Sequence, residues 1–119
     1  MKVKPSQALG RQGEDLAVAY LEQAGFRPLV RNFRTRFGEI DIVCTKNGEY
    51  YFVEVKTRAD HSRGKPVENF PWFRQERLKK MAAAYAQGNK ISNTHLHLSL
   101  LGIDLSGGEP EVTFIADIT

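Results

Sequence analysis

An Asn-Gly dipeptide at Asn47-Gly48 constrains the fold of this chain more than any other feature. It lies between two runs with the composition of β-strands, residues 38–45 and 50–57, and this arrangement is the strongest short signal for a hairpin with a type I′ turn. If Asn47 and Gly48 are the two loop residues, Lys46 pairs with Glu49 and the register of the whole hairpin follows from that pair.

That register brings four charged side chains to one face of the hairpin. It places Asp41 opposite Glu54 and Glu39 opposite Lys56, and residues two apart in a strand point the same way. The alternate positions are apolar and are expected to face a core: Ile40, Ile42, Val53 and Val55.

A sheet that places Asp41 opposite Glu54 needs something to offset the repulsion between the two carboxylates. Two carboxylates opposite each other have Cβ atoms about 5 Å apart, and their repulsion is on the order of 4 kcal/mol at an effective dielectric of about 20. A proton, a nearby lysine or a divalent cation would offset it. The alternative is a solvated face on an edge strand, but the apolar alternate positions favour a central hairpin. Mg²⁺ binds one or two carboxylates and completes its shell with water and phosphate, so a divalent-metal site is favoured.

Apolar residues at helical spacing predict a helix from about Ser6 or Gly10 to Ala24, with Ser6 as a candidate N-cap. Gly25 supplies the C-terminal stop. In this helix Glu14 falls at the edge of the apolar stripe and is expected to look along the core surface toward a sheet, whereas Asp15 points to solvent.

Further elements are predicted at residues 28–35, 94–104 and 111–117, as strands, and from residue 71 or 72 to residue 86, as a helix. The order is α-β-β-β-α-β-β, so the fold class is α/β, with a central mixed sheet flanked by helices. The length of 119 residues suits one domain, 1–119, with residues 1–8 as a candidate disordered tail.

Composition indicates in which compartment the protein works and which kinds of site it lacks. One cysteine, Cys44, cannot form an internal disulfide, no apolar run reaches the length of a membrane span, and the N-terminus has no apolar leader. We therefore expect a cytoplasmic protein that does not associate with membranes. The three histidines lack ligand spacing, which disfavours a zinc site. Trp72, Phe73, Phe33 and Phe37 are interpreted as packing residues rather than base-stacking ones.

The net charge of +3 is a weak indication of a polyanionic partner, and its distribution is a stronger one. Basic residues cluster at positions 27–36, 56–65 and 74–80, around the acidic hairpin. A solvated surface is the alternative for each cluster alone, but three together favour nucleic acid.

At these residues the sequence resembles a known superfamily. Asp41 followed by Glu54-Val55-Lys56, on a hairpin after a helix bearing Glu14, is similar to the PD-(D/E)XK, or restriction-endonuclease-like, nucleases. The runs Gly38–Asp41 and Phe52–Arg58 narrow the resemblance to the YraN-like family of small uncharacterised bacterial proteins. The similarity is dense from about Leu9 to Pro66 and thinner to about Asp104.

The resemblance implies an α-β-β-β-α-β core, as in archaeal Holliday-junction resolvases. It implies that Asp41 and Glu54 bind Mg²⁺ or Mn²⁺, that Lys56 orients or activates the attacking water, and that Glu14 completes the acidic cluster. Related resolvases act as dimers, so a homodimer is a candidate assembly. Basic side chains are expected to contact flanking phosphates of DNA: Arg34, Arg36, Arg58, Arg63, Lys65 and Arg74.

The chain also departs from its relatives in two places. Arg74 or a neighbour stands where relatives tend to carry a lysine in the second helix, and His97 and Ser99 stand where they often carry Arg-Phe-Asp. Three functions remain open: a metal-dependent nuclease acting on DNA phosphodiesters, selective for branched or repair intermediates; a nucleic-acid-binding accessory protein with an intact metal site and little turnover; and a scaffold without metal.

Overall fold

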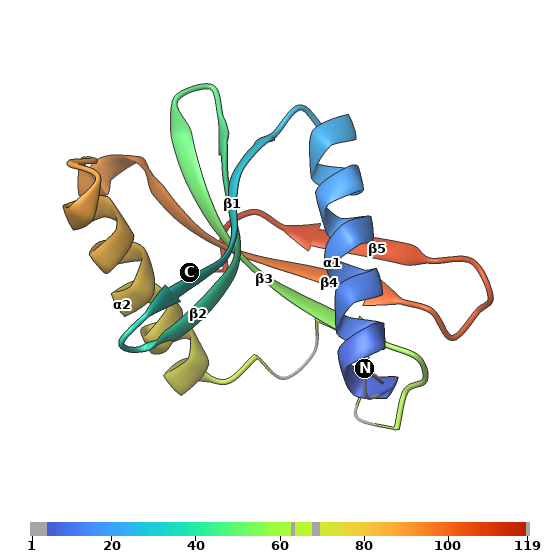
Figure 1. The fold of residues 1–119 in the computed structure, drawn as a ribbon. Helices are drawn as coiled ribbons and strands as arrows, with labels where there is room; N and C mark the ends of the chain where they lie inside the picture. Colours follow the sequence, from blue (N-terminus) through green and yellow to red (C-terminus); the bar gives the residue numbers. More distant parts are fainter. Residues whose placement is uncertain (1–4, 63, 68–69, 119) are drawn as a thin grey trace.

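The computed structural model describes residues 5–62, 64–67 and 70–118 and shows one sheet with a helix on each face (Figure 1). The elements confirm the expected order and mixed α/β architecture. They are α1 (Pro5–Gln23), β1 (Arg27–Thr35), β2 (Gly38–Lys46), β3 (Glu49–Arg58), α2 (Trp72–Gly88), a 3₁₀ turn (Asn93–His95), β4 (Leu96–Asp104) and β5 (Glu111–Ile115).

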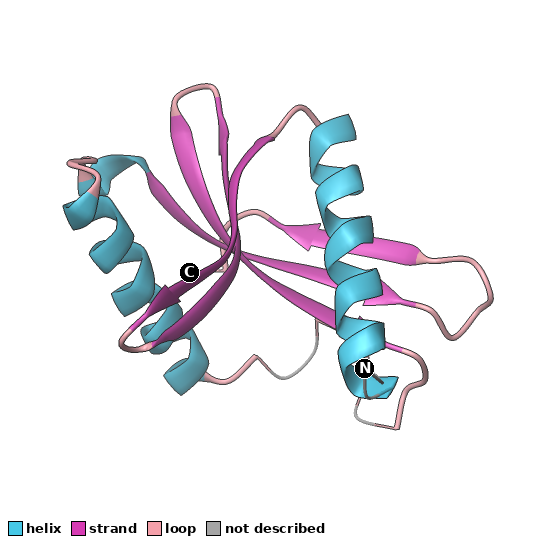
Figure 2. Ribbon diagram, viewed as in Figure 1, coloured by secondary structure: helices cyan, strands magenta, loops and turns pink. Residues whose placement is uncertain are grey.

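The five strands lie in chain order across the sheet (Figure 2). Neighbouring strands are antiparallel except β3 and β4, which are parallel and connected through α2. A parallel pair needs such a crossover, because the chain must return to the same end of the sheet. None of the described helices is long and apolar enough to cross a membrane.

Helix α1 ends as predicted but begins earlier. Gly25 has φ +92°, and the Phe26 N–H donates to the Leu21 carbonyl at 2.9 Å, which closes the last turn with a glycine in the left-handed region. The helix begins at Pro5, so Ser6 lies inside it rather than at its N-cap, and it takes in residues 5–8 of the expected tail.

Both faces of the sheet carry a core, so β2 and β3 are central and the edge-strand alternative is wrong. The α1 side packs Ala17, Leu21, Phe26, Ile42, Cys44, Val53, Leu101 and Ile103. The α2 side packs Ile40, Val43, Phe52, Leu78, Met81, Ala82, Tyr85 and Leu98. Phe33 packs edge-on against Tyr85, with ring centroids 5.1 Å apart, as expected of a core residue.

Packing was the wrong prediction for the first two residues of α2. The Trp72 side chain is 74% exposed and that of Phe73 is 51% exposed, so neither belongs to a core. The core face of α2 lies at buried positions further along, which are Leu78, Met81, Ala82, Tyr85 and Ala86.

The hairpin turn adopts the predicted geometry. Asn47 and Gly48 both have positive φ, +53° and +80°, as a type I′ turn requires. The ladder runs from Lys46–Glu49 to Ile42–Val53, which confirms the derived register over this stretch.

Beyond Ile42 the alternation of β2 breaks. Ile42 packs on the α1 side while Ile40 packs on the α2 side, so the expectation that both face one core is wrong. On the neighbouring strand Asn32 lies between the Arg31–Ile42 and Phe33–Ile40 pairs with φ +54°. A left-handed residue inside a strand bends it and changes which face the following side chains take, an effect that sequence periodicity does not reveal.

Candidate metal and phosphate site

Asp41 lies at the bend in β2. The described ladder ends at the Ile42–Val53 pair, one step before the expected Asp41–Glu54 pair. Beyond this point the Asp41 side chain, rather than its main chain, contacts β3. Its Oδ2 accepts a 2.8 Å hydrogen bond from the Val55 N–H. Burial raises the pKa of Asp41 to about 7, with smaller contributions from Glu54 and Glu14, and the Val55 N–H opposes this rise.

Glu54 lies on β3 with its carboxylate half-buried. Arg74 Nη1 is 3.6 Å from Oε2, an ion-pair distance that is too long for a hydrogen bond. Oε2 is buried and has no hydrogen-bond partner among the described residues. Burial raises the pKa of Glu54, while the positive charges of Arg74 and Lys56 oppose the rise.

Lys56 is only 9% exposed, which is unusual for a lysine. Its Nζ lies over the Phe70 ring, 5.2 Å from the centroid, and burial lowers its pKa while Glu54 opposes this shift. The expected Glu39–Lys56 pairing is not part of the described ladder, because the two strands separate after Ile42. Glu39 instead lies 3.5 Å from Arg34 Nε on β1.

One cavity of about 390 Å³ brings the central residues of the prediction together. It is lined by Asp41, Glu54, Val55, Lys56, Thr57, Arg58 and Arg74. A second cavity, of about 230 Å³, is lined by Leu9, Gly10, Glu14, Asp41, Val55 and Thr57. Asp41 lines both cavities, so it lies between Glu54 on one side and Glu14 on the other.

Glu14 occupies the second cavity from α1. Its Oε1 is buried without a hydrogen-bond partner among the described residues. Burial raises the pKa of Glu14, and both Arg31 and a side-chain hydrogen bond with Asn32 oppose the rise. Asp15 is exposed, as predicted, and makes an ion pair with Arg31 at 2.8 Å.

Gly13 explains how α1 comes close enough to β3 for Glu14 to reach this cavity. A Cβ atom at Gly13 would lie 1.7 Å from Thr57 Oγ1, which is far inside van der Waals contact. Only glycine fits at this crossing. Gly13 therefore places the residue after it beside Asp41.

The donor set suits a hard cation, although no group of three His, Cys, Asp or Glu side chains in the described part of the chain forms a ready-made metal cage. Mg²⁺ needs only one or two carboxylates, since water and substrate phosphate supply its other ligands. Glu54 and Glu14 each have a buried carboxylate oxygen without a hydrogen-bond partner among the described residues, and a cation would satisfy these oxygens. The residues present therefore fit Mg²⁺ or Mn²⁺ bound chiefly by Asp41 and Glu54.

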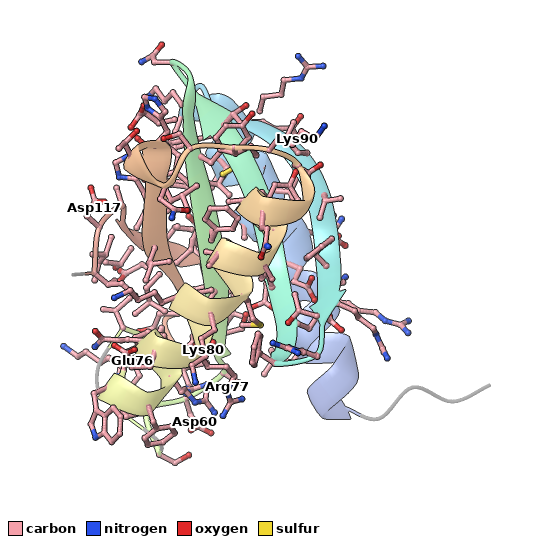
Figure 3. All side chains as sticks on the ribbon, turned by 90° about the vertical axis from the view of Figure 1, so that its left-hand side faces the viewer. Asp60, Glu76, Arg77, Lys80, Lys90 and Asp117 are labelled. Atoms are coloured by element: carbon pink, nitrogen blue, oxygen red, sulfur yellow. The ribbon has the colours of Figure 1, made fainter. Side chains whose placement is uncertain are left out.

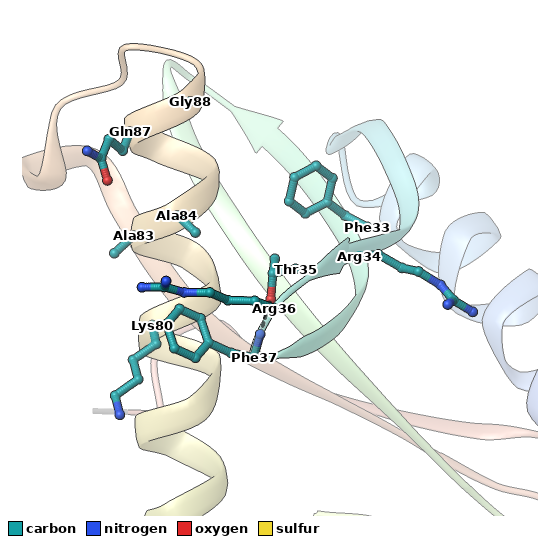
Figure 4. Close-up of a pocket in the computed structure, with 10 residues that line it drawn as sticks. All are labelled: Phe33, Arg34, Thr35, Arg36, Phe37, Lys80, Ala83, Ala84, Gln87 and Gly88. Atoms are coloured by element: carbon teal, nitrogen blue, oxygen red, sulfur yellow. Dashed lines mark hydrogen bonds between the residues drawn. The ribbon is translucent and has the colours of Figure 1, made fainter.

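The predicted phosphate contacts divide into two groups. Arg58 and Arg74 line the cavity with Asp41 and Glu54, and Arg58 Nε is buried without a described partner. Arg34 and Arg36 lie instead beside a larger cavity between the β1–β2 turn and α2 (Figure 4). Lys65 is exposed in the loop after β3. Arg63 lies outside the described residues.

Two features of the site were missed from the sequence. Asn32 bends β1 and bonds Glu14, and the signal was an asparagine, which tolerates positive φ, inside a predicted strand. Arg77 acts on the Glu54 carboxylate through its charge. Its position one turn after Arg74 was the available signal.

His97 and Ser99, which replace residues expected from relatives, make contacts away from this cavity. His97 bonds Glu49 at 2.8 Å and Asp117 at 2.6 Å, and its ring stacks on Tyr51 with centroids 4.5 Å apart. The Ser99 hydroxyl donates to the Ala116 carbonyl at 2.7 Å. Both residues tie the C-terminal segment to the sheet.

Among solved structures, the chain is similar to SfsA of Pyrococcus furiosus in complex with Ca²⁺. The TM-score is 0.42 with 17% sequence identity, and the match covers 93% of this chain and 63% of the SfsA chain.

Curated relatives are much closer in sequence. A UPF0102 protein of Dictyoglomus turgidum is 38% identical over 101 residues, covering 85% of this chain and 86% of the relative. One of Alkaliphilus metalliredigens is 36% identical over 110 residues, covering 92% and 96%. The model of uncharacterised protein family UPF0102 matches residues 13–105, a span that includes Glu14, Asp41, Glu54 and Lys56. The chain therefore belongs to uncharacterised protein family UPF0102, the YraN-like family that its motifs resemble.

Proposed function

We propose that this protein is a Mg²⁺- or Mn²⁺-dependent nuclease that hydrolyses DNA phosphodiesters. The observation that carries the proposal is the shared cavity, in which two carboxylates, Asp41 and Glu54, lie with a buried lysine and two arginines. Carboxylates and guanidinium groups that line one cavity are the two components of a site for a cation and a phosphate.

Each side chain has a part that follows from its position. Asp41 and Glu54 would hold the ion, which lowers the pKa of bound water and neutralises phosphate charge when present. Lys56, with its lowered pKa, is suited to orient the attacking water and to donate hydrogen bonds to a phosphate oxygen. Arg58 and Arg74 present planar donors for the non-bridging oxygens. Glu14, in the adjoining cavity, is the candidate ligand for a second ion.

The alternative is an accessory protein that binds nucleic acid at the same site without turnover. The raised pKa of Asp41 favours this accessory role at low pH, because a protonated carboxylate binds a cation poorly. Cleavage and binding must therefore be measured separately. The substrates are labelled linear single-stranded, linear duplex and four-way branched DNA, each with Mg²⁺ and with Mn²⁺ at pH 8.

The variants Asp41→Asn, Glu54→Gln and Lys56→Met keep side-chain shape while removing charge. We expect each to lower cleavage by at least about 100-fold, with folding unchanged by circular dichroism. Glu109→Gln is the matched control, because Glu109 is an exposed acid in the turn before β5. Equal cleavage in wild type and all three variants would indicate a contaminant and refute the proposal. Binding of DNA without cleavage of any substrate would support the accessory protein.

A further inference from the structure

A second surface, on the outer side of α2, carries both cations and aromatic rings. Two cavities, of about 680 and 340 Å³, lie between α2 and the β1–β2 turn, and both are lined by Phe37 and Lys80. The two cavities adjoin at these shared residues, and together they are called the groove below. Figure 4 shows Arg36 and Lys80 on either side of the Phe37 ring, with Arg34 directed away from them.

Two cations of this groove, Arg36 and Lys80, are held against an aromatic ring rather than by a carboxylate. Arg36 Cζ lies 4.8 Å and Lys80 Nζ lies 5.8 Å from the Phe37 ring centroid. Within the described residues, no carboxylate lies within ion-pair distance of Arg36, Arg77 or Lys80, and Glu76 is the one acid lining either cavity. Figure 3 shows Arg77 and Lys80 on the same stretch of α2. The groove therefore attracts a polyanion.

Phe37 is partly buried against the α2-side core, but the other two rings of this groove, Trp72 and Phe73, are largely exposed. Trp72 and Phe73 are 74% and 51% exposed, and their rings lie 6.2 Å apart at 84°. Large exposed aromatic side chains that touch each other mark an interaction site rather than ordinary surface. Proteins that bind single-stranded nucleic acid commonly combine a positively charged groove with aromatic rings on which the bases stack.

We propose that this cationic–aromatic groove, formed by Arg36, Phe37, Trp72, Phe73, Arg77 and Lys80, binds a single-stranded segment of nucleic acid that leads away from the candidate metal site. The two surfaces adjoin, since Arg77 lines the groove and its positive charge acts on the Glu54 carboxylate. Bases in a duplex are already stacked and paired, so a duplex would leave Trp72 and Phe73 without partners. The inference rests on the proposed function and names its substrate class: DNA with a single-stranded arm or flap.

The test uses Trp72 itself, because it is the single tryptophan of the chain. Oligo-dT of about 15 nucleotides is titrated into the full-length protein in EDTA while tryptophan emission is recorded. We expect saturable quenching with the single strand and at least several-fold weaker binding of a blunt duplex of equal length. The same oligonucleotide, labelled for anisotropy, gives dissociation constants for variants that lack tryptophan.

Variants separate stacking from charge. Trp72→Ala and Phe73→Ala are expected to raise the dissociation constant for oligo-dT by about 10-fold each. Lys80→Gln is expected to weaken binding and to reduce the salt slope by about one. Lys90→Asn is the control, because Lys90 is an exposed cation just beyond the far end of α2 and asparagine tolerates its φ of +56°.

The outcomes distinguish this groove from the metal site. EDTA removes metal, and Asp41→Asn removes cleavage. If oligo-dT still binds this variant in EDTA, the result supports binding at the groove even if the protein cuts no substrate. Unchanged affinity in Trp72→Ala and Phe73→Ala overturns the groove even if the enzyme cleaves DNA. Equal quenching by poly-glutamate of the same charge would also overturn it, because that result would indicate an acidic protein partner.

Discussion

The Val55 N–H donates a 2.8 Å hydrogen bond to Oδ2 of Asp41, so a carboxylate takes the place of a main-chain acceptor where β2 and β3 separate. The bond fixes one oxygen of Asp41 and leaves the other for a ligand. It also opposes only part of the effect of burial, which raises the pKa of Asp41 from 3.8 to about 7. Below about pH 7, the protein without metal therefore favours a protonated Asp41.

This shift predicts how stability depends on pH in EDTA. The folded state holds more protons than the unfolded state between pH 3.8 and about 7, so the free energy of unfolding falls as pH rises through that window. The raised pKa values of Glu54 and Glu14 act in the same direction. Asp41→Asn removes the Asp41 contribution, so its free energy of unfolding should exceed that of wild type by about 4 kcal/mol at pH 8, with little difference near pH 4.

Urea denaturation at pH 4, 6 and 8 measures this difference. Glu109→Gln serves as the control, since an exposed glutamate should leave the pH profile of wild type unaltered. A constant difference between Asp41→Asn and wild type at all three pH values would show that folding does not raise the pKa of Asp41.

A bound divalent metal should stabilise the protein more as pH rises, which is the opposite of the pH dependence expected in EDTA. Binding at Asp41 and Glu54 requires both carboxylates to be ionised, so Mn²⁺ should stabilise wild type more at pH 8 than at pH 5.5. At about 100 times the dissociation constant, the Tm at pH 8 should rise by roughly 10 °C. Differential scanning calorimetry with Asp41→Asn and Glu54→Gln provides the comparison. A similar rise in these variants would place the ion elsewhere.

Gly13 gives a prediction about packing. Gly13→Ala would place a methyl group 1.7 Å from Thr57 Oγ1, so α1 must move away from β3, at a cost of about 1–3 kcal/mol. Gly10→Ala lies one turn earlier with nothing within 4 Å of its added Cβ, and should stabilise the helix by about 0.5–1 kcal/mol. Urea denaturation of both variants measures the contrast. Equal effects would mean that α1 does not approach β3 this closely in solution.

Much of the fold follows from local features of the sequence. Asn47-Gly48 sets the hairpin register because both residues accept positive φ, and Gly25 stops α1 for the same reason. The apolar alternate positions correctly indicate that β2 and β3 are central. These features act within a few residues. They predict Asp41, Glu54 and Lys56 on one face of the hairpin, and in the structure the three line one cavity although the Asp41–Glu54 pair is not in the described ladder.

What the sequence did not reveal depends on contacts across the fold. Asn32 bends β1 beside Asp41, and no periodicity marks a single left-handed residue in a strand. The Glu39–Lys56 pair failed because regular pairing was extended past that bend. Phe73 fits the apolar pattern of α2, yet its side chain is 51% exposed. Each of these differences depends on which residues from distant parts of the chain pack beside the side chain, and hydrophobic periodicity does not specify those residues.

His97 offers a prediction at the opposite end of β3. Burial lowers its pKa, but hydrogen bonds to Glu49 and Asp117 outweigh this and raise the pKa above 6.5. The imidazolium therefore contributes stability that is fully present below pH 6.5 and is lost as pH rises through the raised value. Asp117→Asn removes one of the two anions, so it should be less stable than wild type at pH 6 and nearly equal to it at pH 9.

Two measurements check this expectation. NMR titration of the His97 ring should give a lower pKa in Asp117→Asn than in wild type, and urea denaturation at pH 6, 7.5 and 9 should show the stability difference shrinking. Asp15→Asn is the matched control, because Asp15 makes an exposed ion pair with an arginine, Arg31, instead of a histidine. Its small effect should be the same at every pH. If Asp117→Asn behaved likewise, the charge on His97 would make no contribution to holding the C-terminal segment against β4.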